Sequence, residues 1–209
     1  MTPTPGSSQY GLALHASGAQ LGLALGNGPI LLRQEARDTG RELANVLQIR
    51  LGGFLAPLDW EELSYLSVSR GPGSFTSLRI GLTCARIIAQ QFSLPLFTFS
   101  SLQAYAQFLQ PETPLVAVTQ TATQGKLYGG VYRIRGGLAQ PWEDNPAQND
   151  RLWAPAEWED YLATLPHPPP QLQTPENLGE TAPALLTLAW SQWLAGARPF
   201  WAEATPFYG

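Results

Sequence analysis

Residues 69–81 read SRGPGSFTSLRIG and decide how the rest of the chain is interpreted. An apolar, strand-like segment precedes them and a long segment with helical spacing follows. Gly71 and Gly73 tolerate backbone conformations that other residues avoid, which predicts a tight turn. Ser74 or Thr76 can then cap the helix. In such a strand–turn–helix unit the free backbone N–H groups at the start of the helix point toward a bound anion, as in phosphate sites. The alternative is that the turn only reverses the direction of the chain.

Strands and helices are predicted on both sides of this unit. Three short strands joined by hairpin turns open the chain, and helices and strands then alternate. A looser second half carries a proline-rich connector, residues 166–170. Residues 136–151 are expected to form an exposed loop, and the predicted strands and helices together indicate an α/β protein. The predicted strands are 9–15, 20–26, 30–34, 65–69, 95–99, 115–119 and 127–135, and the predicted helices are 41–55, 76–91, 102–109, 155–165 and 182–195.

Composition excludes several classes of protein. The 209 residues are 44% hydrophobic and only 13% charged, which argues against disorder. Residues 1–110 carry a net charge of +1 and residues 111–209 one of −5, so neither half is a basic platform for autonomous nucleic-acid binding. The single cysteine, Cys84, rules out an internal disulfide and fits a reducing compartment. We expect a cytoplasmic protein with no targeting segment and no contact with a membrane.

The glycine motif carries a family resemblance. Residues 70–76 and 78–82 resemble the signature of the TsaB (YeaZ-like) family, whose members support threonylcarbamoyladenosine biosynthesis in tRNA. Weaker similarities lie in residues 12–17, 125–128 and 206–208. The resemblance implies the actin-like, Hsp70-like ATPase superfamily, with two ribonuclease-H-like domains that each have a mixed sheet and flanking helices.

The resemblance implies a division of the chain into two domains. Residues 1–104 would form an N-terminal actin-like domain with the Gly-Pro-Gly motif and two docking helices. Residues 105–209 would form a smaller C-terminal one. A return of the last residues, Pro206–Gly209, to the first domain is left open.

The sequence departs from the family pattern where nucleotide chemistry would need acids. His15 stands where the first strand usually ends in Ile-Asp-Thr, and a histidine is a poor ligand for a hard cation. Thr121 or a neighbour replaces an aspartate expected before the Gly-x-x-Tyr strand, and Ser77 replaces a glycine. We interpret His15 as a hydrogen-bonded strand end and expect no metal site. The departures favour a non-catalytic scaffold over an enzyme.

The helix after the turn is the candidate interaction surface. Ser77, Gly81 and Ala85 recur every four residues, and such a stripe of small residues lets another helix approach closely. An alternative is that this is a central helix packed inside one domain. Arg70 and Arg79 are expected to contact a partner, or else to fix the turn. The candidate partner-binding residues are Leu43, Leu47, Arg70, Gly71, Pro72, Gly73, Phe75, Thr76, Ser77, Leu78, Arg79, Gly81, Leu82 and Ala85.

The resemblance implies partners, and an alternative function stays open. The partners implied are a TsaD-like catalytic subunit, a TsaE-like ATPase, and tRNA reached only through the complex, with no cofactor of the chain's own. A homodimer and a nucleotide at a subunit interface are left open. The alternative function is a nucleotide-dependent phosphotransferase or ATPase of the same fold. A peptidase is disfavoured because Ser74 has no histidine near it in sequence to activate it.

Overall fold

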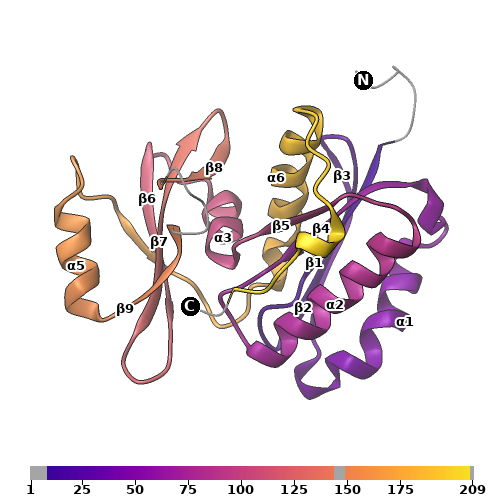
Figure 1. Cartoon of the computed structure of the whole chain (residues 1–209), viewed down its shortest axis with the longest axis horizontal. Helices are drawn as coiled ribbons and strands as arrows, with labels where there is room; N and C mark the ends of the chain where they lie inside the picture. The colour runs from indigo at the N-terminus through magenta and orange to yellow at the C-terminus, as the bar shows by residue number, and fades with distance from the viewer. Residues whose placement is uncertain (1–8, 144–148, 208–209) are drawn as a thin grey trace.

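The computed structural model describes residues 9–143 and 149–207. The strands form two five-stranded sheets, each with helices against its faces (Figure 1). Both sheets contain parallel and antiparallel pairs, which confirms the predicted fold class of two mixed sheets with flanking helices. Among the described residues, no helix combines the length and the apolar character that crossing a membrane requires.

The first sheet has the order β3-β2-β1-β4-β5. Tight hairpins connect its first three strands, which are therefore antiparallel, whereas helical crossovers make β1, β4 and β5 parallel. The hairpin at Gly28 has the positive φ of +60° that suits glycine. The strands are β1 (Tyr10–His15), β2 (Gln20–Asn27), β3 (Ile30–Asp38), β4 (Leu63–Ser69) and β5 (Leu96–Phe99).

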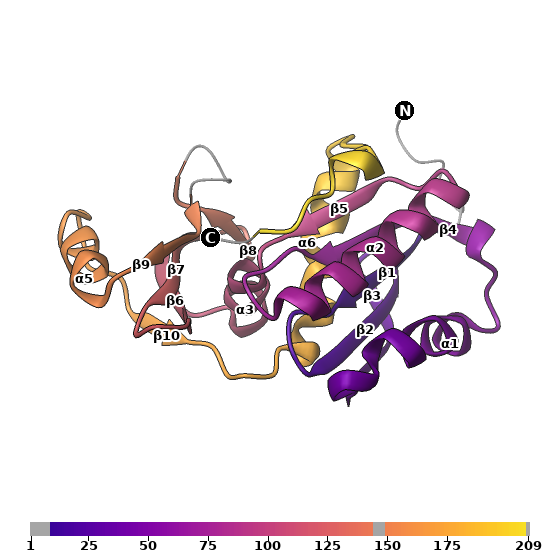
Figure 2. The same cartoon turned by 60° about the horizontal axis from the view of Figure 1, so that its bottom comes forward.

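Helices cover both faces of the first sheet (Figure 2). Alternation along β1 supplies both cores, because Leu12 and Leu14 pack with α1 (Leu43–Leu55) and α2 (Phe75–Gln91), while Ala13 points the other way. The opposite face carries α6 (Ala182–Leu194), which is buried along Ala182, Leu185 and Ala189. Short 3₁₀ turns lie at η1 (Gly40–Glu42), η2 (Trp60–Glu62), η3 (Gly179–Thr181) and η4 (Trp201–Glu203).

The second sheet has the order β10-β6-β7-β8, with β9 also paired to β7. One face packs on α3 (Ser101–Leu109) and the other on α5 (Pro155–Ala163), whose Trp158 is almost fully buried. The strands are β6 (Leu115–Thr121), β7 (Leu127–Arg135), β8 (Leu138–Pro141), β9 (Arg151–Trp153) and β10 (Gln171–Gln173).

The predicted exposed loop at 136–151 is wrong in part. It contains β8, and Ala139 in this strand is fully buried. Two amides of α3 hold its backbone: Gln103 Nε2 donates to the Ala139 carbonyl at 2.8 Å, and the Ala139 N–H donates to Gln107 Oε1 at 2.8 Å. Glycines and polar residues suggested a loop, whereas hydrogen bonds from a distant helix stabilise a strand there. The strand β10, after the proline connector, was not predicted.

The helix α6 comes from the second half of the chain but packs on the first sheet. Residues 105–209 were expected to form the second domain, yet α6 from this half lies on the first sheet, and the predicted boundary at 104 falls inside α3. The chain also returns at its end: the Leu96 N–H donates to the Pro199 carbonyl at 3.2 Å, and the Phe207 N–H donates to the Arg70 carbonyl at 2.8 Å. Residues 208–209 of the predicted return lie outside the described residues.

Candidate protein interface

The glycine turn packs closely against the loop that follows β1. Gly71 and Gly73 have φ values of +108° and +157°, in the region that favours glycine. A Cβ on Gly73 would lie 2.2 Å from the carbonyl oxygen of Ser17, so only glycine fits this approach. The Ser74 N–H donates to the same carbonyl at 2.7 Å.

Ser74 is the residue that caps α2. Its Oγ accepts from the Ser77 N–H at 3.4 Å, while its carbonyl accepts from the Leu78 N–H at 2.9 Å. The backbone N–H groups of residues 74, 77 and 78 therefore already have acceptors within the chain. The turn therefore connects β4 to α2, caps the start of α2 and holds this helix against the first sheet.

The stripe of small residues faces the chain's own sheet. A Cβ on Gly81 would lie 2.7 Å from the Cβ of Ala16, and Ser77 and Ala85 are buried at 8% and 4% exposure. The stripe was expected to admit a partner helix, but the space beside it is filled by β1 and the residue after it. The alternative of a centrally packed helix therefore describes this side of α2.

The opposite side of α2 borders a hollow of about 770 Å³ that it shares with α1. Arg79 is the charged residue in its lining, and the guanidinium carbon lies 5.1 Å from the ring centroid of Phe75, which is itself 56% exposed. Ile87 is 58% exposed. We call this surface the α1–α2 groove, and its lining residues are Ala44, Leu47, Gln48, Leu51, Gly52, Trp60, Arg79, Ile80, Thr83, Cys84, Ile87, Ile88, Gln91 and Phe92.

Only part of the predicted partner-binding set lies on the groove. Leu47 and Arg79 line it, and Phe75 and Thr76 are exposed at the start of α2. The groove-lining isoleucines of α2 were left out of the predicted set, although their helical spacing was visible in the sequence. The remaining predicted residues, apart from Arg70 and the half-buried Gly73, are buried inside the chain: Leu43, Gly71, Pro72, Ser77, Leu78, Gly81, Leu82 and Ala85.

Cys84 is half-buried and lines the groove. Partial burial raises the pKa of its thiol, which keeps the group protonated near neutral pH. Cys84 therefore contributes to the groove as a small apolar side chain.

Arg70 points away from the groove, into a second hollow of about 350 Å³ between the two sheets. Asp150 reaches this hollow from the second sheet and is almost fully buried. It accepts hydrogen bonds from the Tyr132 hydroxyl and, at 3.1 Å, from Asn149 Nδ2. Ser100, at the start of α3, lies 3.3 Å from the Tyr132 hydroxyl and completes a polar link between the sheets.

The surroundings of Asp150 have opposing effects on the pKa of its carboxyl. Burial raises the pKa of its carboxyl, while the hydrogen bonds and the positive charge of Arg70 act in the opposite direction. Burial together with the Asp150 carboxylate also raises the pKa of Tyr132. Sequence reasoning missed Asp150 because it lies in a segment that was predicted to be an exposed loop.

His15 lies at the end of β1, fully buried, with a pKa lowered to about 3 by that burial. Neither ring nitrogen has a hydrogen-bond partner among the described residues, so the prediction of a hydrogen-bonded strand end is wrong. A neutral imidazole in such a place is a poor ligand for a hard cation. Within residues 9–143 and 149–207, no three His, Cys, Asp or Glu side chains gather in a way that could hold a metal ion.

Comparisons with known proteins agree with this architecture. Two solved structures share the fold over 96% of the chain: a protein from Pseudomonas aeruginosa described as similar to the peptidase YEAZ, with a TM-score of 0.77 and 22% identity, and YeaZ from the same organism, with a TM-score of 0.74 and 20% identity. The matches cover 99% and 100% of those chains. The two-sheet fold expected from the resemblance is thereby confirmed.

Sequence relatives cover less of the chain. The tRNA threonylcarbamoyladenosine biosynthesis protein TsaB of Bacillus subtilis (strain 168) is 32% identical over 108 residues, which is 52% of this chain and 45% of that protein. TsaB of Buchnera aphidicola subsp. Schizaphis graminum (strain Sg) is 30% identical over 79 residues, which is 37% of this chain and 38% of that protein. The matched stretches thus span less than half the length of these relatives.

A family model covers more than half of the chain. It is described as TsaD, tRNA N6-adenosine threonylcarbamoyltransferase, and it matches residues 55–164, from the end of α1 through α5. Proteins named TsaB are relatives of the chain by sequence, and the chain belongs to the family that this model describes.

Proposed function

We propose that this chain is a non-catalytic subunit of the assembly that forms N6-threonylcarbamoyladenosine in tRNA, and that it binds a TsaD-like catalytic subunit through the α1–α2 groove. The TsaB relatives and the family match support the process. The groove supports the mode of action, because a monomeric protein rarely leaves a hollow this apolar facing water.

Shared fold supports the identity of the partner. The family match includes α2 and begins at the last residue of α1, and we expect a TsaD-like subunit to present a related pair of helices on its own first sheet. Two related surfaces of this kind can meet in a quasi-symmetric contact of four helices. The same geometry would permit a homodimer through the groove when the catalytic subunit is absent, so the two contacts would compete.

The catalytic work belongs to the partner in this proposal. His15 offers an uncharged ring where the family pattern has an acid, and the backbone N–H groups of residues 74, 77 and 78 donate to acceptors within the chain. A TsaE-like ATPase joins the pair, and tRNA is recruited by the whole assembly. The chain needs no cofactor of its own, and any nucleotide would lie at a subunit interface.

Two exposed isoleucines provide a matched test. Ile87 lies in the groove at 58% exposure, and Ile30 lies on β3 at 62% exposure, outside the residues that line the groove. We expect Ile87→Glu to weaken binding to the TsaD-like protein of the same cell by about tenfold or more, because a carboxylate would be buried in an apolar contact. Ile30→Glu should leave the affinity within about twofold, since surface changes away from a contact have small effects.

The measurement is titration calorimetry after co-purification of the two proteins, with thermal melting of each variant as a control for folding. Equal binding by Ile87→Glu and the unmodified chain would refute the groove as the docking site. Failure of the unmodified chain to bind any TsaD-like protein from the same cell would refute the proposed partner.

A further inference from the structure

A third hollow, of about 330 Å³, lies on the second sheet, on the side covered by α5. It collects basic and aromatic side chains from segments that are distant in sequence: the ends of β6 and β7, the residue after β8, and the start of the proline connector. We call it the basic–aromatic pocket, and its lining residues are Pro114, Leu115, Arg133, Ile134, Arg135, Trp142, Pro166 and His167.

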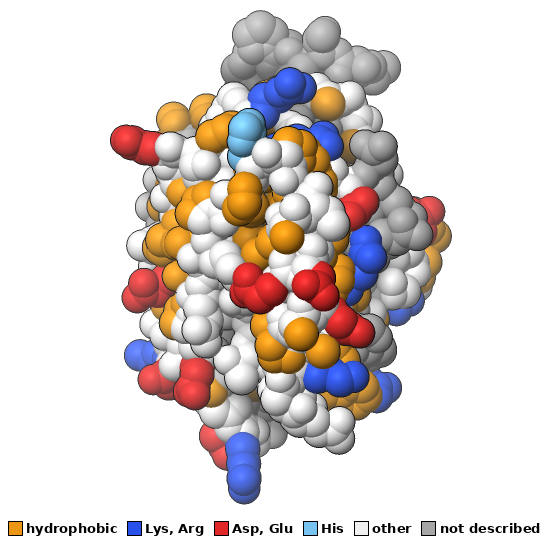
Figure 3. Space-filling view, turned by 90° about the vertical axis from the view of Figure 1, so that its left-hand side faces the viewer, with side chains coloured by type: hydrophobic (Ala, Val, Ile, Leu, Met, Phe, Trp, Pro, Cys, Tyr) orange, Lys and Arg blue, Asp and Glu red, His pale blue; other side chains and the backbone are white. Residues whose placement is uncertain are grey.

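The face that holds this pocket is shown in Figure 3. A histidine side chain is visible on the upper part of this face, and His167 of the pocket is exposed. Basic side chains lie above it in this view and hydrophobic side chains below it. Acidic side chains gather lower on the same face, so the pocket region is basic although residues 111–209 are acidic as a whole.

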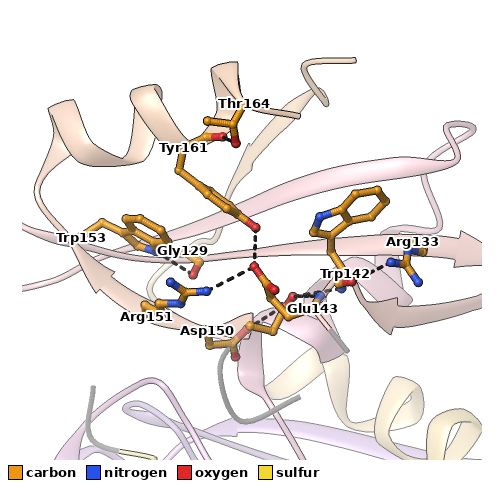
Figure 4. A network of polar contacts seen from close by, with 10 residues as sticks. Gly129, Arg133, Trp142, Glu143, Asp150, Arg151, Trp153, Tyr161 and Thr164 are labelled. Carbon is orange, nitrogen blue, oxygen red and sulfur yellow. Dashed lines mark hydrogen bonds and ion pairs between the residues drawn. The ribbon is translucent and has the colours of Figure 1, made fainter. Parts of the chain in front are cut away.

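The positive charges of the two arginines in the pocket are not neutralised by a carboxylate of the described residues. Neither Arg133 nor Arg135 forms an ion pair with a carboxylate among the described residues, and none of the residues that line the pocket is acidic. The neighbouring carboxylate, Glu143, is engaged elsewhere: Arg151 lies 3.2 Å from it, and the Tyr161 hydroxyl donates to it at 3.0 Å (Figure 4). Glu143 therefore does not pair with the arginines of the pocket.

Trp142 is held in a fixed position beside Arg133. The backbone N–H of Trp142 donates to the Val131 carbonyl at 2.9 Å, and the backbone carbonyl of Trp142 accepts from Arg133 Nη2 at 2.8 Å. The guanidinium carbon of Arg133 lies 4.3 Å from the Trp142 ring centroid, which is a cation–π contact. A half-buried indole with an arginine stacked on it is a preformed platform for a flat, electron-rich ring.

We infer that the basic–aromatic pocket binds a nucleotide of single-stranded RNA, with the base against Trp142 and the backbone phosphates beside Arg133 and Arg135. These arginines are two residues apart on one face of β7, about 6.6 Å along the strand. That spacing allows them to contact different phosphates of an extended strand, and their forked guanidinium groups match phosphate oxygens. An aromatic platform combined with phosphate partners is the usual pattern for unpaired RNA.

An acidic peptide is the competing occupant. It would use the arginines but would leave the indole without a flat ring to stack on. The choice of RNA over a peptide as the occupant rests on the proposed function. The geometry of the pocket and its basic and aromatic lining are independent of that function. Within the assembly this contact adds to those of the other subunits, so the affinity of the isolated chain is expected to be low.

The test measures fluorescence anisotropy of a labelled RNA hairpin with an unpaired loop, titrated with the full chain at low salt. Arg135→Glu changes an exposed side chain and should weaken binding by about tenfold, and Trp142→Ala should do the same. Arg41→Glu, an equal charge change at an exposed site on the first half, is the matched control and should alter binding by about twofold or less. Two phosphate contacts predict a slope of about −1.4 in log affinity against log salt.

Several outcomes would overturn the inference. These are no binding at low salt, an equal loss with Arg41→Glu, or displacement of RNA by an acidic peptide at lower concentration than by unlabelled RNA. Thermal melting separates misfolding of Trp142→Ala from loss of contact, and Arg135→Glu remains informative in that case. Ile87→Glu should leave RNA binding unchanged, so failure of the pocket and failure of the proposed partner are distinguishable.

Discussion

His15 shows at the scale of one residue how burial determines chemistry. Its ring lies in the interior without a hydrogen bond among the described residues, and only the neutral form is tolerated there. The folded-state pKa of about 3 lies below the ordinary value of 6.5, so the unfolded chain binds the extra proton first as the pH falls. The contribution of His15 to stability is therefore complete above pH 6.5 and is lost progressively between pH 6.5 and pH 3.

We predict that this histidine contributes a slope of up to about 1.4 kcal/mol per pH unit to the free energy of unfolding across that window. His15→Leu should remove this contribution, whereas His167→Gln, at the exposed second histidine, should retain it. Urea unfolding at a series of pH values measures the difference between variants. Parallel curves for His15→Leu and the unmodified chain would contradict the prediction.

The link between Tyr132 and Asp150 supports a second prediction. Tyr132→Phe removes the hydroxyl that donates to a buried carboxylate, and we expect a loss of about 1–3 kcal/mol in the free energy of unfolding. The pKa of Asp150 should also rise further, because a hydrogen bond that favours its charged form is lost. Tyr105→Phe is the control, since this hydroxyl has no hydrogen bond among the described residues and the change should be close to neutral.

At the scale of single elements, α2 has two sides with different roles. Its small residues lie against β1, and its isoleucines line the groove that it shares with α1. The helical spacing in the sequence revealed both rows. The spacing alone did not distinguish the side that meets the chain's own sheet from the side that is free, because that depends on the position of β1.

Two glycines should respond in opposite ways to the same change. We predict that Gly81→Ala is destabilising by about 1–3 kcal/mol, since its methyl group would lie 2.7 Å from Ala16. Gly53→Ala in α1 should be stabilising by about 0.5–1 kcal/mol, because no atom lies within 4 Å of the new methyl and alanine favours the helix. Thermal unfolding of both variants measures this. Equal effects at the two sites would contradict the packing of α2 on β1.

Local patterns were good guides to elements but poor guides to short strands. The positions of α2, α6 and β7 followed from spacing and from turn residues, to within one residue at each end. The short strands β8, β9 and β10 were not predicted. β9 and β10 are three residues long and pair with strands far away in sequence, whereas β8 forms a hairpin with β7 in a segment whose glycines and polar residues suggested a loop. The amides of Gln103 and Gln107 that hold Ala139 carry no signal of that role in the sequence.

At the scale of the whole molecule, the arrangement of the two sheets was the hardest feature to predict. The fold class followed from the order of elements and the glycine motif, but α6 packs on the first sheet although it comes from the second half of the chain. Such a return depends on complementary packing between residues far apart in sequence, for which a single sequence gives no direct signal. The groove and the two further hollows are products of that arrangement.

The scaffold proposal predicts weak or absent binding of MgATP by the isolated chain. The backbone N–H groups of residues 74, 77 and 78 already have acceptors, and the strand end offers a neutral His15 in place of an acid. Calorimetric titration should therefore give no affinity tighter than about 1 mM, a free energy of about −4.1 kcal/mol. Micromolar affinity would favour the alternative of a nucleotide-dependent enzyme.

The most direct test of the central claim is the formation of N6-threonylcarbamoyladenosine in a reconstituted reaction. The mixture contains tRNA, the TsaD-like and TsaE-like proteins of the same cell and threonylcarbamoyl-adenylate, with or without this chain. We predict that modified adenosine accumulates only when the chain is present, that Ile87→Glu abolishes the effect and that Ile30→Glu retains it. Equal product without the chain, or full activity of Ile87→Glu, would contradict the account.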